Sequence, residues 1–411
     1  MICKKIASII PLVLILLMTS IQLGVCHSFS QSAVDRDYWP TDEWQTSTPE
    51  EQGMRSSVLN DMMNATEENQ LLIDSVLIVK NGYLVFEEYP SVYDQDNRHI
   101  IHSCTKSITS ALVGIAIEEG YIDSVDEKLV DLLPNRTYAN YDERIDDITL
   151  EHLLMMTSGF EWDEWTESYS SYANSHYQYW RASNSVQFIL DLPLAHDPGD
   201  VRVYSSGSSH LLSAIVTRAT GVSLLEYAAE KLFTPLGIEI SDVVWPADNQ
   251  GIYRGSGGVE MIPRDMAKFG FLFLNNGTWN GEQIVPSGWV QTSSETLTTF
   301  DNYSGYSYQW WTYSSETVSV YSANGYVGQN IFVIPSLDMV VVFTSRTPTY
   351  PQVSLLFDYI IPAALTEVPQ NILATYTLTL ATIVMLPLPL LVAGVYHRFR
   401  FRYSEEELIE K

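Results

Sequence analysis

The strongest constraint on the fold is a set of strand-forming runs near both ends of the central part of this chain, which lies between two long apolar segments at its termini. Residues 76–79 and 83–86 are rich in β-branched and aromatic side chains, and Asn81-Gly82 between them is a strong hairpin signal. A second set of strand-like runs comes later, at residues 306–313, 329–334 and 339–344. Together the two sets predict one α+β domain built from both ends of this region.

The sequence between these runs is mostly helical and rich in loops. Residues 107–119 have helical periodicity and stop at Gly120, a good residue to end a helix. We therefore expect a mostly helical domain inserted between the two sets of strands. The other stretches with helical patterns are residues 150–156, 210–218, 224–232 and 265–274.

The N-terminal segment has the pattern of an export signal. Lys4-Lys5 precede an apolar stretch at residues 6–25, as in the charged and apolar regions of a secretory signal. Residues 1–27 are therefore predicted to be a signal peptide. Because the apolar stretch is long, an uncleaved signal anchor is the alternative.

The C-terminal segment has the pattern of a membrane span. No side chain from residue 368 to 396 is charged, and residues 372–396 are long enough for a helix to cross the hydrocarbon core. The basic cluster that follows is expected to stay on the cytoplasmic side, as a tail at residues 397–411. The central part is then predicted to lie outside the cytoplasm, tethered to the membrane by a single transmembrane helix.

Composition and charge exclude some classes of function. With 22 basic and 50 acidic residues, the formal net charge of −28 argues against nucleic-acid binding, which needs a basic surface. Cys104 is the single cysteine between the predicted signal segment at residues 1–27 and the C-terminal apolar segment, so no disulfide can form within the central part. His99 and His102 have no neighbours that complete a metal site, and neither a metal nor a cofactor is predicted.

The tetrad Ser103-Cys104-Thr105-Lys106 at the start of the apolar helix carries the candidate chemistry. Its spacing puts Ser103 and Lys106 on the same helix face. A serine hydroxyl needs a base to become a good nucleophile, and burial lowers the pKa of a lysine so that it can be that base. Such a tetrad alone usually marks a solvated helix start. Its place after a hairpin and before an apolar helix favours a catalytic site.

Four segments downstream of the tetrad strengthen this interpretation. In order, the five segments are 101–116 (IHSCTKSITSALVGIA), 148–160 (ITLEHLLMMTSGF), 198–207 (PGDVRVYSSG), 257–270 (GGVEMIPRDMAKFG) and 325–329 (GYVGQ). Together they resemble the β-lactamase-related serine hydrolases, which include class C β-lactamases, certain esterases, D-amino-acid peptidases and 6-aminohexanoate-dimer hydrolases. The resemblance implies a β-lactamase/transpeptidase-like fold at residues 45–366, with an antiparallel sheet, flanking helices and an inserted helical domain.

The resemblance also implies a role for each matching residue. Ser103 would attack a carbonyl and form an acyl-enzyme, and Lys106 would accept its proton. Tyr204 would be a second general acid/base that passes the proton to the leaving group, with Lys106 as the nearby cation that helps it to ionise. The backbone N–H groups of Ser103 and Tyr326 would form the oxyanion hole.

Two positions depart from the family pattern. Ser206 stands where the second motif often has asparagine, and Ala323 stands where the third motif often has lysine or histidine, two residues before Gly325. In the family these side chains commonly contact a β-lactam, so their absence disfavours penicillin chemistry. Ser206 and Gly325 are instead predicted to bind a small ester or linear amide. Within the family, the sequence of residues 155–159 most resembles the 6-aminohexanoate-dimer hydrolases.

The sequence leaves three functions open. The first is a membrane-tethered hydrolase of esters or small linear amides, and the second is a peptidoglycan-directed D-amino-acid peptidase or penicillin-binding protein. The third is a non-catalytic receptor or scaffold on the same fold, against which the intact catalytic set argues. Asp163, Glu164 and Trp165 fit either the mouth of the cleft or a solvated loop.

Overall fold

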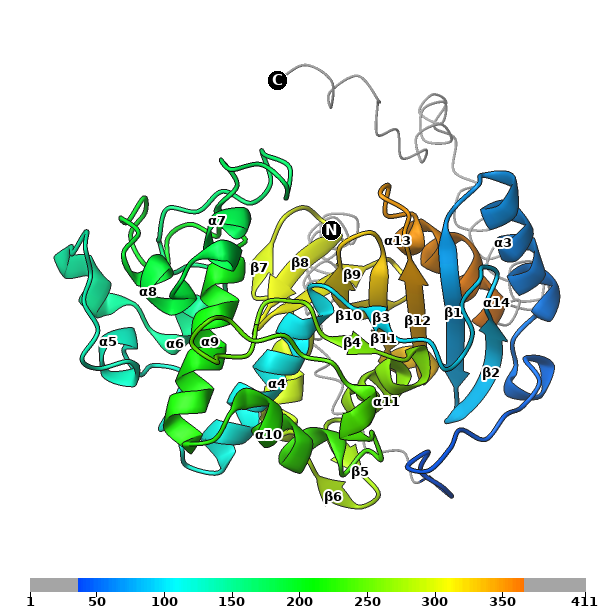
Figure 1. Cartoon of the computed structure of the whole chain (residues 1–411). Coiled ribbons are helices and arrows are strands. Elements are labelled where there is room, and N and C mark those ends of the chain that lie inside the picture. The colour runs from blue at the N-terminus through cyan, green and yellow to red at the C-terminus, as the bar shows by residue number, and fades with distance from the viewer. Residues whose placement is uncertain (1–35, 366–411) are drawn as a thin grey trace, which may run out of the picture. The chain divides into compact units, whose positions relative to one another are not determined.

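An eight-stranded antiparallel sheet forms the core of the computed structural model, which describes residues 36–365 (Figure 1). β1 (Ile73–Lys80) and β2 (Tyr83–Glu88) form the predicted hairpin, and β1 also pairs with β12 (Met339–Ser345). Strands from both ends of the central region therefore share one sheet. From β12 the sheet continues through β11 (Gln329–Ile334), β10 (Ser319–Gly325), β9 (Trp310–Ser314), β8 (Ser304–Ser307) and β7 (Thr298–Thr299).

The predicted strand over residues 306–313 is a tight hairpin of two strands, β8 and β9. Between them Tyr308 and Gln309 adopt left-handed backbone conformations, with φ of 38° and 69°. The Gln309 side-chain amide donates to two carbonyl oxygens at the end of α6 (Leu150–Leu154), at 3.1 and 2.7 Å. The break in the strand therefore coincides with a contact to a helix that is distant in the sequence. Strand propensity alone does not predict such a break.

Helices cover both faces of the sheet because successive strand residues point to opposite sides. Val76 and Ile78 of β1 belong to the core beneath two terminal helices, and Leu77 and Val79 belong to the larger core on the other face. A helix on that larger face lies very close to the sheet, since a Cβ at Gly270 would be 2.7 Å from side-chain atoms of β11 and β12. The terminal helices are α3 (Ser56–Glu68) and α14 (Ile361–Ala364), and Gly270 lies in α11 (Pro263–Leu274).

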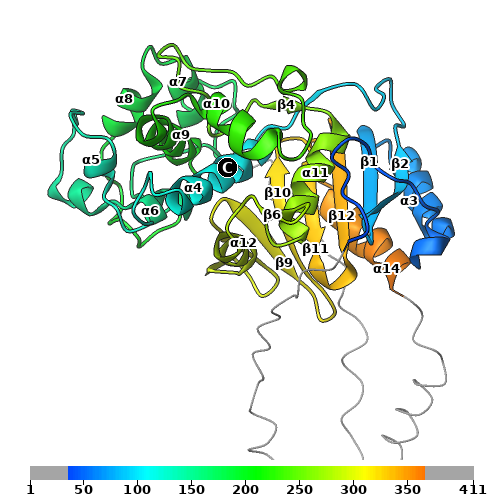
Figure 2. The same cartoon turned by 90° about the horizontal axis from the view of Figure 1, so that it is seen from below.

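The middle of the chain forms the predicted helical region beside the sheet (Figure 1). Its longest helix, α9 (Ser206–Thr220), packs against α4 (Cys104–Glu118), and α4 also contacts β10. Since α4 is buried from Cys104 to Ala116, it is the element that joins the two regions (Figure 2). The shorter helices are α5 (Leu129–Leu132), α6, α7 (Ser175–Arg181), α8 (Ser185–Leu190) and α10 (Leu224–Ala228), with α12 (Ser287–Ser294) near β8 and β9.

The sheet, its flanking helices and the inserted helical region confirm the predicted α+β fold class. The predicted signal segment at residues 1–27, the predicted transmembrane helix at 372–396 and the predicted tail at 397–411 lie outside the described residues. Within residues 36–365, no helix combines the length and the apolar character that a membrane span needs.

Candidate active site

Ser103 lies at the N-terminus of α4, at the end of a tightly held connection. The short strand β3 (His99–Ile100) pairs with β4 (Glu260–Met261), and the Ile101 N–H donates to the Val259 carbonyl at 2.8 Å. His102 then takes a left-handed conformation with φ of 47°, which turns the chain into the helix. The Ser103 side chain does not cap the helix, so its hydroxyl is not occupied by the backbone of α4.

Lys106 is buried one helical turn after Ser103, with 2% of its surface exposed. Its Nζ lies 3.1 Å from Ser103 Oγ, 3.1 Å from Ser206 Oγ and 2.7 Å from the Ser256 carbonyl oxygen. Burial lowers the pKa of Lys106 to about 8, and the negative charge of Glu164 opposes this shift. Lys106 is therefore placed to accept a proton from Ser103 under mildly alkaline conditions.

Tyr204 is buried beside this pair, in the segment that leads into α9. Lys106 Nζ lies over the Tyr204 ring, 4.9 Å from its centroid. Burial raises the pKa of Tyr204 well above its usual value, and the charge of Glu164 adds to this effect, while an interaction with Ser103 partly opposes it. Burial therefore favours the protonated phenol, and the expectation that Lys106 helps Tyr204 to ionise stays a prediction. As a phenol, Tyr204 is suited to donate a proton.

The end of β10 approaches the chain immediately before Ser103. A Cβ at Gly325 would overlap the Ile101 carbonyl oxygen, so this position requires glycine for the close approach. Gly325 is thereby a packing residue beside the nucleophile. Tyr326 follows it, 44% exposed, with its ring 5.7 Å from the His102 ring. The predicted partner of Ser103 in the oxyanion hole is therefore brought to the start of α4.

Ser206, a predicted substrate-binding residue, is buried next to Lys106. Its hydroxyl donates to Glu164 Oε1 at 2.7 Å and lies within hydrogen-bond distance of Lys106 Nζ. Because these buried partners use the Ser206 hydroxyl, its side chain belongs to the interior of the site. Its predicted contact with the substrate stays a prediction.

Glu164 is the functional candidate that the sequence did not distinguish from its neighbours. It is 2% exposed and lies against Ser206, whereas Asp163 is exposed and Trp165 is 61% exposed. The Trp165 ring contacts the Tyr204 ring edge-on, with centroids 5.2 Å apart. The segment of residues 163–165 therefore contributes one buried carboxylate and one exposed aromatic ring to the site. Asp163 and Glu164 both lie between two tryptophans, so this sequence pattern indicates the loop but does not distinguish Glu164.

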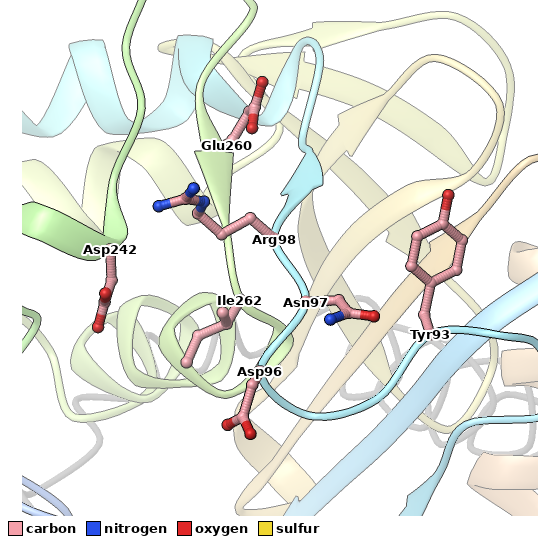
Figure 3. A pocket seen from close by; sticks show the side chains of 7 residues that line it. All are labelled: Tyr93, Asp96, Asn97, Arg98, Asp242, Glu260 and Ile262. Atoms are coloured by element: carbon pink, nitrogen blue, oxygen red, sulfur yellow. The ribbon is translucent and has the colours of Figure 1, made fainter.

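A separate pocket lies next to β3 and β4 (Figure 3). None of the predicted catalytic or substrate-binding residues lines it, and Arg98 in its wall donates to the Ser241 carbonyl at 3.1 Å. Among residues 36–365, no group of three or more His, Cys, Asp or Glu residues could hold a metal ion. The lining residues are Tyr93, Asp96, Asn97, Arg98, Asp242, Glu260 and Ile262.

Fold and site together define a serine hydrolase with a β-lactamase/transpeptidase-like fold. The chain belongs to the beta-lactamase family, whose model matches residues 61–364. The family resemblance seen in the sequence and the assignment as a serine hydrolase are thereby confirmed.

Relatives and solved structures agree with this assignment. The chain is 26% identical over 321 residues to a 6-aminohexanoate-dimer hydrolase of Paenarthrobacter ureafaciens, a match that covers 73% of this chain and 80% of the relative. A structure from Bacillus anthracis, provisionally assigned as a 6-aminohexanoate-dimer hydrolase, has a TM-score of 0.63 and 26% identity, over 74% of this chain and 81% of that one. An octameric penicillin-binding protein homologue from Pyrococcus abyssi shares the fold, with a TM-score of 0.59 and 19% identity, over 80% of this chain and 77% of that one.

Proposed function

We propose that this chain hydrolyses esters or small linear amides through an acyl-enzyme on Ser103. The observation that carries this proposal is the buried Lys106, with Nζ 3.1 Å from Ser103 Oγ and a pKa lowered to about 8 by burial. A lysine in this state is neutral often enough to remove the serine proton at mildly alkaline pH.

The proposed reaction has two halves. Ser103 Oγ forms a bond to the substrate carbonyl carbon while its proton moves to Lys106, and the N–H groups of Ser103 and Tyr326 stabilise the oxyanion. The bond to the leaving group then breaks as Tyr204 donates its proton to the departing oxygen or nitrogen, and Tyr204 regains a proton from Lys106. In the second half, water attacks the acyl-enzyme along the same proton route, which releases the acid and restores Ser103.

Two features support esters and small linear amides over β-lactams. Ala323 is fully buried in β10, so this position supplies no cation for a β-lactam carboxylate. The Ser206 hydroxyl is engaged by Glu164 and Lys106, so it is not free to bind an amide side chain of the substrate. The related protein of Paenarthrobacter ureafaciens is, by its name, a hydrolase of a 6-aminohexanoate dimer, which supports a small amide as the substrate.

Covalent labelling tests the nucleophile, and a substrate panel tests its preference. A fluorophosphonate probe should modify wild type at Ser103, located by peptide mass spectrometry. The probe should not label Ser103→Ala. The control is Ser287→Ala, which removes an exposed serine on α12 and should be labelled as wild type is. Wild type should then hydrolyse p-nitrophenyl esters or linear amides faster than D-aminoacyl amides and nitrocefin. Failure of wild type to label would refute the acyl-enzyme, and a stable adduct with labelled penicillin would favour a penicillin-binding protein.

We also propose that this hydrolase works outside the cytoplasm on a membrane tether. The support is the sequence pattern of residues 1–27 and 372–396. In an expression host with general secretion, the full chain should sediment with membranes, and external protease should digest its catalytic part in intact cells. A chain that ends at residue 367 should instead appear in the soluble exported fraction. Recovery of the full chain in the cytosol would contradict the proposal.

A further inference from the structure

Four donors surround the buried Glu164 carboxylate behind the Ser103–Lys106 pair. Its Oε1 accepts from the Ser206 hydroxyl at 2.7 Å and the Tyr169 hydroxyl at 3.0 Å. Its Oε2 accepts from Trp162 Nε1 and from the Ser206 backbone N–H, both at 2.8 Å. Two donors at each oxygen are what an ionised, acceptor-only carboxylate requires.

This arrangement fixes the direction of the neighbouring hydrogen bonds. The Ser206 hydroxyl has one proton, and that proton points to Glu164, so Ser206 Oγ can only accept from Lys106. The Ser256 carbonyl oxygen is also an acceptor without a proton to give. A neutral lysine has two N–H groups and one lone pair. Both N–H groups are therefore used by Ser206 and Ser256.

We propose that Glu164 is a positioning residue that, through Ser206, leaves the lone pair of neutral Lys106 directed at the Ser103 hydroxyl. This inference rests on the proposed function and goes beyond it, because it explains how the base is aimed. Glu164 itself touches neither the nucleophile nor the leaving group in this scheme. Its effect passes through one hydroxyl whose direction it sets.

Glu164 also acts on Lys106 through its charge. The negative charge favours the protonated lysine and so opposes the lowering of its pKa by burial. Burial lowers the pKa values of His102 and His176 to about 4 and raises those of Cys104, Tyr169 and Tyr204, so these groups are neutral near pH 8. Two guanidinium groups lie further back, with Arg202 6.0 Å from the Tyr204 ring and Arg254 5.3 Å from the Tyr179 ring.

Glu164→Gln tests the proposed direction of the hydrogen bonds. The glutamine oxygen can still accept from the two N–H donors at the Oε2 position, but its NH2 group then faces the two hydroxyls. The Ser206 hydroxyl must accept from this NH2 group and turn its own proton toward Lys106. The Lys106 lone pair would then point to Ser206 instead of Ser103. We expect fluorophosphonate labelling at pH 8 to slow by about tenfold to a hundredfold, part of what general-base catalysis contributes.

A second substitution distinguishes misdirection from damage to the fold. Ser206→Ala removes the hydroxyl that would capture the lone pair, so Glu164→Gln/Ser206→Ala should label several times faster than Glu164→Gln alone. If both substitutions only damaged packing, the double variant would label as slowly as Glu164→Gln alone, or more slowly. Ser206→Ala alone should label more slowly than wild type, because Lys106 loses one of its two acceptors. The control is Glu167→Gln, an exposed carboxylate in the same loop, which should label like wild type.

The pH profile gives an independent readout. Removing the charge of Glu164 should lower the pKa of Lys106 further, so the labelling rate of Glu164→Gln should reach its plateau at a lower pH than that of wild type. A purely structural role of Glu164 would reduce the labelling rate without changing the pH at which that rate reaches its plateau.

The possible outcomes separate this inference from the proposed function. If wild type does not label at Ser103, the proposed function fails. If wild type labels, three results would each overturn the role of Glu164. These are a Glu164→Gln rate equal to wild type, an unmoved pH limb, or no recovery in the double variant. If Glu164→Gln does not fold, an undiminished rate in Ser206→Ala overturns it.

Discussion

Lys106→Met should make the protein inactive and change how its stability depends on pH. Methionine has a similar length and fits an apolar interior, so the fold should be retained. Wild type holds a buried lysine whose pKa is lowered from 10.5 to about 8. The unfolded chain binds the lysine proton more tightly than the native protein does. Between these two pKa values, wild type therefore gains stability as the pH rises, and below about 8 the full penalty is present.

The size of this effect follows from the two pKa values. The difference between 10.5 and about 8 corresponds to about 3 kcal/mol against protonated Lys106 in the native state. Most of this penalty disappears between pH 7 and pH 10. Over that range the free energy of unfolding of wild type should therefore rise by about 2–3 kcal/mol relative to that of Lys106→Met. The hydrogen bond lost at the Ser256 carbonyl adds a constant offset that does not depend on this titration.

Urea unfolding of both proteins at several pH values measures this difference. Groups that titrate alike in the two proteins cancel when their free energies of unfolding are subtracted. Lys128→Met, in which a 40% exposed lysine side chain is lost, controls for the removal of one positive charge. A difference between wild type and Lys106→Met that stays constant from pH 7 to pH 10 would refute the reasoning, because Lys106 would then not be desolvated.

Three further predictions concern the base and the two glycines that allow close packing. Lys106→Arg should slow fluorophosphonate labelling of the nucleophile by about 10²–10⁴-fold, because a guanidinium cannot accept the proton. Gly270→Ala should lower stability in urea unfolding by about 1–3 kcal/mol, because its Cβ would be 2.7 Å from side chains of β11 and β12. Gly288→Ala on α12, where a new Cβ meets nothing within 4 Å, is its matched control and should not lose stability. Gly325→Ala should reduce both kcat in ester hydrolysis and the melting temperature, because its Cβ would push β10 away from Ile101.

The sequence could predict the parts of the site that depend on local geometry. Ser103 and Lys106 are one helical turn apart, so a helix at this place sets their relation whatever surrounds it. The strands were predictable for a similar reason, since their side-chain alternation and turn signals lie within a few residues of one another. The Gly325–Tyr326 segment was instead predicted from the family resemblance, because Gly325 meets Ile101, which is distant in the sequence, only in the folded protein.

The unpredicted parts depend on contacts between residues far apart in the sequence. Glu164 is buried because its loop folds back, with Asn174 donating to the carbonyl oxygens of Glu164 and Glu167 at 3.2 and 2.7 Å. Ser206 is used internally because that loop delivers a carboxylate to it. Gln309 interrupts a strand-like run to reach α6. In each case the side chain is polar and the nearby sequence does not show which distant partner satisfies it.

The position of α4 between the sheet and the helical region affects how the site can be lost. Its first turn carries Ser103 and Lys106, while the sheet supplies Gly325 and the helical region supplies Tyr204 and Glu164. The amides of a helix buried on all sides exchange with solvent only when the surrounding structure opens. Hydrogen exchange in α4 should therefore report global unfolding, and the loss of nucleophile reactivity on heating should coincide with it. Neither region should retain a reactive serine when it is expressed without the other.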